Sequence, residues 1–419
     1  MLIAHSAAAD VSTDSSFLPT LEEWKKVFAS GGVEACRTMM ERKRDGWKSL
    51  SLNVAVTGNS GVGKSSFINA IRGLKSAEDK RAAEVDVKET TLEMRSYPHP
   101  DNPKLLFWDL PGVGTNQYPK ASYLSDIKFD RYDFFLLMTA DRFTENDTWL
   151  GKEIHKRNKK YFFVRSKIAV DISNNRRSHP QTHNEEDVIK KIRQATLKQL
   201  RENGCENMQM FLIDNYKPKK FDFEELKRRL VEDFPKLKKT ALILSLQATS
   251  EEMIRLKKEK LLARACGMAV LAGVVAAVPV PGVSVGTNFA VVVAETGVYF
   301  TQLGLDEESL KRYAKFTPVD YSQLQSIVDR RLGRTGLNLD RIKDLLTRRG
   351  ADLLEDAARL EFSRFIPIFG SYTVYQETYK ALKVVIEETA SVALEVDDAI
   401  IKCDSSSTGS STGSESDDE

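Results

Sequence analysis

Hydrophobic and polar positions along the chain change their pattern near residue 235. Before that point short apolar runs alternate with amphipathic segments, and after it amphipathic segments follow one another. The apolar runs predict strands at Leu52–Val56, Leu105–Asp109, Phe134–Thr139, Tyr161–Arg165 and Met210–Ile213. The segments between them predict helices at about 65–74, 145–158, 185–203 and 222–233. This alternation is typical of a mostly parallel sheet with helices on both faces.

The two ends of the chain predict a second, all-helical domain. Thr20 and Glu23 match a capping box, so a helix is expected to begin there, and further helices are expected after residue 235. These later helices are predicted at about 306–315, 320–332, 338–349, 351–364 and 371–402. We expect the N-terminal helices to pack on the C-terminal ones, with the last helix beside them. A less hydrophobic run, Thr90–Tyr97, predicts an antiparallel edge strand for the sheet.

The predicted fold class is therefore α/β, with a mostly parallel sheet domain at 50–233 and an all-α domain. The all-α domain combines an N-terminal helical segment, 1–49, with a C-terminal helical domain, 234–403. Residues 404–419 contain seven serines, five acids and no large apolar side chain, which predicts a disordered acidic tail. This tail is expected to solubilise the chain, although phosphorylation or a basic partner is an alternative.

One long apolar stretch in the helical part permits two interpretations. Residues 265–280 carry no charge, and residues 284–300 carry only Glu295. Each arm is shorter than the roughly 20 residues that a bilayer span requires, so a spanning helix is not expected. The hairpin is either buried in the core of the helical domain or inserted shallowly in a membrane. Farther on, arginines and lysines between 330 and 349 could meet anionic lipid or form a solvated helix face.

Composition is that of an ordinary water-soluble protein. The 419 residues are 41% hydrophobic and 29% charged, with net charge +2, and the five acids of the tail leave +7 for the rest. Four cysteines show no paired spacing, which argues against a disulfide framework or a zinc ribbon. Basic patches interleaved with aromatics are absent, so no nucleic-acid partner is expected. Without a signal-peptide pattern at its start, the protein is expected to be cytoplasmic.

The most specific motif follows the first predicted strand. It is G-x-x-x-x-G-K-[ST], and its members are Gly58, Asn59, Ser60, Gly61, Val62, Gly63, Lys64 and Ser65, with Ser66 next. Its glycines let the backbone N–H groups surround phosphates at the start of a helix. Lys64 is expected to contact the β- and γ-phosphates, and Ser65 to hold Mg²⁺. The alternative, a glycine-rich turn before a surface helix, does not explain the strand and helix on either side.

A second phosphate motif ends the strand Leu105–Asp109. Asp109 is placed to reach Mg²⁺ through water, and the Gly112 N–H to meet a γ-phosphate. Between the two motifs, Thr90 or Thr91 is the candidate switch threonine for metal and phosphate, or else a β-branched strand residue. Glu89 is a candidate catalytic acid acting across a dimer, or else a solvated surface acid.

Base recognition has a weaker signal. Ser166 and Lys167 follow the strand Tyr161–Arg165, where guanine-binding loops carry [NT]-K-x-D, but the acidic position is occupied by Ala169. Lys167 retains the stem that packs on a base. Asp171 could supply the missing carboxylate if the loop rearranges, and Asn215 in a later loop could also contact the base. Guanine is favoured, and adenine is the alternative.

These motifs resemble those of the immunity-related GTPases, which are interferon-inducible, dynamin-like cytosolic proteins. The resemblance is carried by G-N-S-G-V-G-K-S-S-F-I-N-A-I-R-G (58–73), F-W-D-L-P-G-V-G (107–114), F-F-V-R-S-K (162–167) and R-E-N-G (201–204). Gly63 before Lys64 places the chain with the Gly-Lys-Ser branch. The resemblance implies GTP and GDP as ligands, nucleotide-dependent self-assembly into a dimer or oligomer, and action in innate immune defence at membranes around intracellular pathogens. The expected location is therefore cytoplasmic, with peripheral association with those membranes.

Together these observations predict a GTPase that requires Mg²⁺. Val113 follows Gly112 where Ras-like enzymes have a water-orienting glutamine, so hydrolysis is expected to be slow in the monomer. Lys64, Glu89 and Thr91 are the candidate catalytic residues, and self-assembly is expected to raise the rate. The alternative function is a nucleotide-gated scaffold with little or no hydrolysis.

Overall fold

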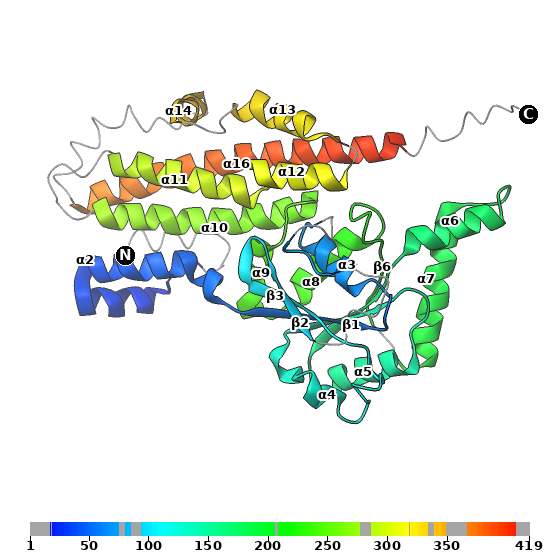
Figure 1. The fold of residues 1–419 in the computed structure, drawn as a ribbon. Helices are drawn as coiled ribbons and strands as arrows, with labels where there is room; N and C mark the ends of the chain where they lie inside the picture. Colours follow the sequence, from blue (N-terminus) through cyan, green and yellow to red (C-terminus); the bar gives the residue numbers. More distant parts are fainter. Residues whose placement is uncertain are drawn as a thin grey trace, which may run out of the picture. The chain divides into compact units, whose positions relative to one another are not determined.

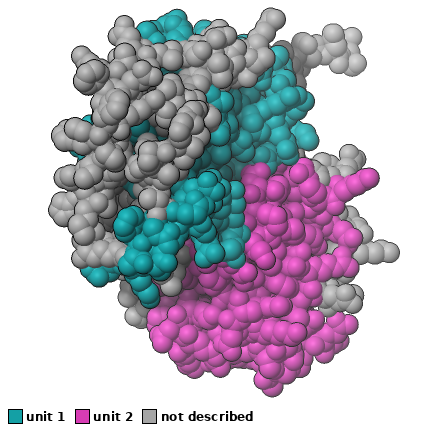
Figure 2. All heavy atoms as spheres, turned by 90° about the vertical axis from the view of Figure 1, so that its left-hand side faces the viewer, with its two compact units in different colours: residues 1–49, 247–419 teal, residues 50–246 magenta. Residues whose placement is uncertain are grey.

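The chain forms two compact units in the computed structural model (Figure 2). The sheet unit comprises residues 50–246, and the helical unit comprises residues 1–49 with 247–419. The structure describes residues 17, 19–74, 80–84, 94–205, 208–276, 286–317, 319–333, 339–348 and 367–407. The sheet unit extends past the predicted boundary at residue 233, because α9 (Lys236–Ser245) packs on a strand of the sheet. Asn102 of that strand donates to the Ser245 hydroxyl at 2.7 Å.

The sheet has six described strands in the order β2-β3-β1-β4-β5-β6. Their bounds are β1 (Leu52–Gly58), β2 (Arg95–His99), β3 (Asn102–Asp109), β4 (Phe134–Thr139), β5 (Lys160–Arg165) and β6 (Met210–Leu212). All pairings are parallel except that of β2 with β3, which confirms the mostly parallel sheet with an antiparallel edge strand. In the register of β1 with β3, Val56 lies opposite Asp109. The ends of both motif-bearing strands are therefore neighbours.

Helices cover both faces of this sheet. They are α3 (Lys64–Ile71), α4 (Tyr123–Asp126), α5 (Glu145–Lys156), α6 (Ile168–Ser178), α7 (Glu185–Glu202) and α8 (Phe223–Asp233), besides α9. Phe135 and Phe163 point into a core shared with α5, α6 and α7, whereas Phe67 of α3 packs on Phe223 of α8 on the other face. Every residue of β4 is buried, as expected for a central parallel strand.

The helical unit joins both ends of the chain, as predicted (Figure 1). Its helices are α2 (Leu21–Asp45), α10 (Glu251–Ala276), α11 (Gly286–Gln302), α12 (Glu307–Phe316), α13 (Tyr321–Leu332), α14 (Leu339–Arg348) and α16 (Pro367–Ser407). The capping box of Thr20 and Glu23 is present. Gly31 and Gly32 have non-helical backbone angles, which interrupt α2 and divide it into the two N-terminal helices that the sequence suggests.

The first arm of the apolar stretch is core where it is described, and the second arm is partly buried. Helices α10, α11 and α16 run side by side, and α2 packs on α10 (Figure 1). The last helix, α16, packs mainly on α10 and α11. The sequence pattern instead predicts that it packs beside the N-terminal helices. Ala265, Cys266 and Ala269 of α10 are fully buried. Glu295, the one acid of the second arm, forms an ion pair with Arg264, and both side chains are buried. Across the described helices, none is long and apolar enough to cross a membrane.

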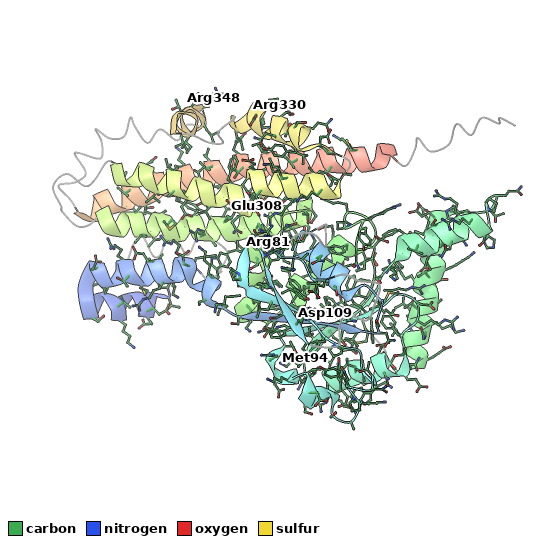
Figure 3. All side chains as sticks on the ribbon, viewed as in Figure 1. Arg81, Met94, Asp109, Glu308, Arg330 and Arg348 are labelled. Carbon is green, nitrogen blue, oxygen red and sulfur yellow. The ribbon has the colours of Figure 1, made fainter. Side chains whose placement is uncertain are left out.

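Three arginines of the cationic stretch between 330 and 349 form ion pairs within the chain. Arg330 and Arg331 of α13 form ion pairs with Glu395 and Glu388 of α16, and Arg348 pairs with Asp344. Figure 3 labels Arg330 and Arg348 on the helical unit. The predicted tail begins within α16, which continues to Ser407. The predicted helix at 351–364 and residues 408–419 lie outside the described residues.

Candidate nucleotide site

The phosphate-binding loop has the strand, loop and helix context that the sequence predicts. It begins at Gly58, the last residue of β1, and ends at Gly63, which precedes α3. Gly58, Gly61 and Gly63 have φ of 148°, 75° and 90°, a region that other residues rarely adopt. A Cβ atom at Gly58 would also lie 2.1 Å from the Met138 carbonyl oxygen. The tight curl of this loop therefore depends on glycine.

Lys64, Ser65 and Asp109 meet at the carboxyl ends of β1 and β3. The Lys64 side chain is 5% exposed, and its Nζ donates to the carbonyl oxygens of Gly58 at 3.0 Å and Asn59 at 3.2 Å. The Ser65 hydroxyl donates to Asp109 Oδ2 at 2.7 Å. Figure 3 labels Asp109 within the sheet unit. A hydroxyl beside a carboxylate suits Mg²⁺, and an ammonium over a glycine-rich loop at a helix start suits phosphate, so these residues fit both groups.

The segment after Asp109 lies against the phosphate-binding loop. A Cβ atom at Gly112 would be 3.0 Å from the Gly58 carbonyl oxygen, so the two backbones touch. The Pro111 carbonyl oxygen accepts hydrogen bonds from Tyr123 Oη at 2.8 Å and Thr57 Oγ1 at 3.2 Å. Sequence reasoning missed Thr57 and Tyr123, because nothing in their local pattern links them to this segment. Burial raises the pKa of Tyr123 above its usual range, so its hydroxyl remains a donor.

Val113 stands at the position where a water-orienting side chain would be expected. It is 5% exposed and packs in the apolar core with Tyr123 and Leu110. An apolar, buried side chain can neither accept from nor donate to an attacking water. Any group that activates water must therefore come from elsewhere.

The two predicted base loops are tied to the phosphate-binding loop. Ser166 is fully buried, and its hydroxyl donates to the Val62 carbonyl oxygen at 2.6 Å. Asn215 Nδ2 donates to the Gly63 carbonyl oxygen at 3.0 Å. Lys167 has φ of 61° and immediately precedes α6. Ser166 and Asn215 thus brace the loop through backbone contacts, and Lys167 lies where both loops converge.

Asp171 is engaged elsewhere. It lies in the first turn of α6, and its carboxylate accepts a hydrogen bond from Arg165 Nη2 at 2.9 Å. The structure instead places another acid, Asp214, at the base loops. Its Oδ2 accepts from the Ala169 backbone N–H at 3.3 Å. Sequence reasoning considered this later loop only for Asn215. The signal that could have identified Asp214 is that the later loop carries an acid while the expected acidic position, 169, is an alanine.

The remaining predicted residues are placed as follows. Ser60 is exposed in the phosphate-binding loop, and Ser66 is half-buried in α3. Glu89, Thr90 and Thr91 lie outside the described residues.

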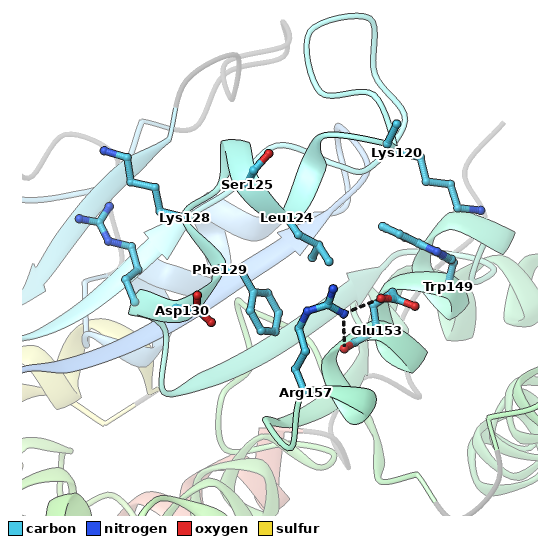
Figure 4. Close-up of a pocket in the computed structure, with 11 residues that line it drawn as sticks. Lys120, Leu124, Ser125, Lys128, Phe129, Asp130, Trp149, Glu153 and Arg157 are labelled. Atoms are coloured by element: carbon cyan, nitrogen blue, oxygen red, sulfur yellow. Dashed lines mark hydrogen bonds and ion pairs between the residues drawn. The ribbon is translucent and has the colours of Figure 1, made fainter.

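A separate pocket lies beside α4 and α5 (Figure 4). It has a volume of about 1170 Å³, and Lys120, Trp149 and Arg157 contribute to its lining. Lys120 Nζ lies 5.1 Å from the centre of the Trp149 ring, and Arg157 pairs with Glu153. None of the predicted nucleotide-site residues lines this pocket, so it is distinct from the phosphate site.

The sheet, the glycine loop and the Lys64, Ser65 and Asp109 cluster define the protein as a P-loop nucleotide-binding protein. A family model described as "Interferon-inducible GTPase (IIGP)" matches residues 20–396. The chain therefore belongs to the interferon-inducible GTPase family.

Two sequence relatives agree with this assignment. The chain is 34% identical over 353 residues to interferon-inducible GTPase 5 of Rattus norvegicus, covering 84% of this chain and 75% of the relative. It is 37% identical over 269 residues to T-cell-specific guanine nucleotide triphosphate-binding protein 2 of Mus musculus, covering 64% of each chain. Among solved structures, the bacterial dynamin GTPase LeoA matches with a TM-score of 0.36 and 12% identity, over 97% of this chain and 96% of that one.

Proposed function

We propose that this protein binds GTP and GDP with Mg²⁺, hydrolyses GTP slowly alone and faster after self-assembly, and acts at intracellular membranes in innate immune defence. The observation that carries the proposal is the meeting of Lys64 with the Ser65 and Asp109 pair at one edge of the sheet. Family membership supports the immune role.

Each residue of the cluster has a distinct task in this proposal. Lys64 exchanges its bonds to the Gly58 and Asn59 carbonyl oxygens for the β- and γ-phosphate oxygens. Backbone N–H groups of the loop donate to the same phosphates. Ser65 and Asp109 hold the metal, the carboxylate acting through water. Bound Mg²⁺ supplies positive charge that neutralises the charge developing during phosphoryl transfer.

The switch from GTP to GDP would be sensed by the segment after Asp109. Gly112 contacts the loop that holds the phosphates, so its N–H can follow the presence of the γ-phosphate. We infer that Thr90 or Thr91 contributes a second contact to phosphate and metal. The group that activates water is supplied across a dimer, and Glu89 is the candidate for it.

The buried Val113 supports the self-assembly part of the proposal. Since Val113 cannot orient water, a site completed by a second copy would hydrolyse GTP faster than an isolated one. A charged group added by a second molecule raises the rate of GTP hydrolysis by about a thousandfold or more in other GTPases. The same observation favours the second candidate function, a nucleotide-gated scaffold that hardly hydrolyses.

Phosphate release measured against protein concentration separates these two functions. Specific activity that rises with concentration supports the assembling GTPase, and low activity that stays constant supports the scaffold. Lys64→Ala should abolish tight nucleotide binding and self-association together. Lys190→Ala, a change on α7 away from the phosphate cluster, is the matched lysine control and should retain both. Nucleotide capture and self-association that survive Lys64→Ala would refute the proposal.

Competition between ATP and GTP tests the choice of base. Preference for GTP supports the proposal, and preference for ATP would require an adenine nucleotide instead.

Membrane action is tested on the intact chain. Flotation with vesicles that contain anionic lipid should increase with GTP if the assembled protein binds membranes peripherally. Because Ala265 and Cys266 are buried, insertion of this part of α10 in a membrane would require the helical unit to open. Flotation without any increase in hydrogen exchange of α10 would support binding through the surface.

A further inference from the structure

Guanine recognition requires an acceptor pair. The guanine edge presents two donors side by side, the ring N1–H and the exocyclic amine at C2, and a carboxylate can accept from both. At the position where sequence reasoning expects this carboxylate, the chain has Ala169. Asp171, the nearest acid in sequence, is paired with Arg165. The carboxylate must therefore come from another element if guanine is read in this way.

Asp214 places a carboxylate against position 169 from the neighbouring loop. Its Oδ2 accepts from the Ala169 N–H at 3.3 Å, and its Oδ1 accepts from the Tyr216 N–H at 3.0 Å. The side chain is 5% exposed, so its orientation is held by its surroundings. A backbone hydrogen bond from Ile168 N to the Ile213 carbonyl oxygen at 3.3 Å joins the two loops next to it.

The Asp214 loop is also joined to the phosphate site. Its next residue, Asn215, donates to the Gly63 carbonyl oxygen immediately before Lys64. Asp214 thus belongs to a loop that touches both the phosphate-binding loop and the loop of Lys167. A base stacked on the Lys167 stem would lie between these same elements.

We propose that Asp214 is the guanine-specificity residue of this protein and replaces the carboxylate that is missing at position 169. A carboxylate has about four acceptor sites, so Asp214 can keep its backbone donors and also accept from the base. In this proposal the carboxylate that reads guanine comes from the loop of Asp214 and not from the loop of Ala169. This inference rests on the proposed binding of guanine nucleotides and names the residue that selects the base.

Calorimetric titration with GDP, IDP and XDP tests the assignment. Hypoxanthine lacks the amine at C2, and xanthine has a carbonyl there. The unaltered protein should bind GDP about tenfold to a hundredfold more tightly than IDP. Asp214→Asn should lose most of this preference and gain affinity for XDP, because its amide can donate to the xanthine carbonyl. Equal affinities of the unaltered protein for GDP and IDP would overturn the inference without any variant.

Two further variants separate base reading from a purely structural role. If Asp214 only ties the loops together, Asp214→Asn lowers the affinities for GDP, IDP and XDP by the same factor. If Asp171 reads the base instead, Asp171→Asn produces the shift to XDP. The double variant Ala169→Asp with Asp214→Ser returns the acid to the first loop and should restore the preference for GDP over IDP. The inference is overturned by an equal loss of affinity for all three diphosphates in Asp214→Asn, or by a shift to XDP in Asp171→Asn.

Failure of the inference differs from failure of the proposed function. A protein that binds GDP tightly, but whose base preference ignores Asp214, loses only the assignment of this residue. If the protein binds none of the three diphosphates, although thermal unfolding shows that it is folded, the proposed binding of guanine nucleotides is refuted.

Discussion

Replacing Glu295 by alanine should destabilise the helical unit by about 3–5 kcal/mol. Arg264 Nε and Nη2 donate to the two Glu295 carboxylate oxygens at 2.7 and 2.9 Å. The side chains are 6% and 5% exposed, so water cannot replace the lost partner. The variant would therefore leave a buried guanidinium without its main counter-charge.

The magnitude follows from what remains around Arg264. Two charge-assisted hydrogen bonds disappear, each worth about 1.5–3 kcal/mol. Arg264 Nη1 keeps its bond to the Arg44 carbonyl oxygen at 3.0 Å and lies 3.8 Å from Asp45 Oδ1. These contacts offset part of the loss, because Asp45 is itself about one-third exposed and partly screened. A loss near 4 kcal/mol is a large part of the 5–15 kcal/mol typical of a folded domain.

Hydrogen exchange followed by mass spectrometry measures this effect within one unit. The free energy of opening should fall in peptides from α10 and α11, whereas peptides from β4 in the sheet unit serve as the reference. The matched control is Arg264→Met with Glu295→Leu, which removes both charges and should recover most of the stability. A loss below about 1 kcal/mol in Glu295→Ala would refute the reasoning, because the pair would then be accessible to water.

Two further predictions concern the phosphate site. Gly58→Ala should unfold at a much lower temperature than Gly61→Ala, since only the former places a Cβ against the Met138 carbonyl oxygen, while both carry about 1–3 kcal/mol of backbone strain; equal shifts in thermal unfolding would contradict this. Tyr123→Phe removes a buried donor to Pro111 and should cost about 0.5–1.5 kcal/mol, because Thr57 still donates to the same oxygen. Because burial raises the pKa of Tyr123, the folded protein keeps this proton longer than the unfolded chain, so the stability from this group is complete below about pH 10 and is lost as the pH rises further. Unfolding measured against alkaline pH should therefore show a weaker decline in Tyr123→Phe, and an unchanged decline would argue against this residue as its source.

Several features of the fold and site were predictable because they depend on local patterns. The sequence of β4 predicts a buried strand at Phe134–Thr139, and the structure has the same bounds. The capping box at Thr20 and Glu23 is equally local. The sequence predicts that Lys64, Ser65 and Asp109 lie close together, because the carboxyl ends of adjacent parallel strands lie at one edge of a sheet.

Other features depend on contacts between distant segments. Asp171 could have served the base loop, but α6 begins at Ile168 and brings its carboxylate within reach of Arg165. The helix α6 itself was not predicted, because its mixed polar sequence follows directly on a strand and has a weak apolar pattern. Likewise, the pairing of Arg264 with Glu295 could not be read from either segment alone.

The sequence by itself determined the class of this protein. Alternating apolar runs, the glycine loop and Asp109 specify a P-loop nucleotide-binding domain, because each of these features lies within a short stretch of chain. Only the tertiary structure decided which acid lies at the base loops and that residues 265–273 of the apolar stretch are core. Both features depend on contacts between side chains that are far apart in the sequence. The local sequence pattern alone does not distinguish Asp171 from Asp214, or a buried stretch from a membrane-inserting one.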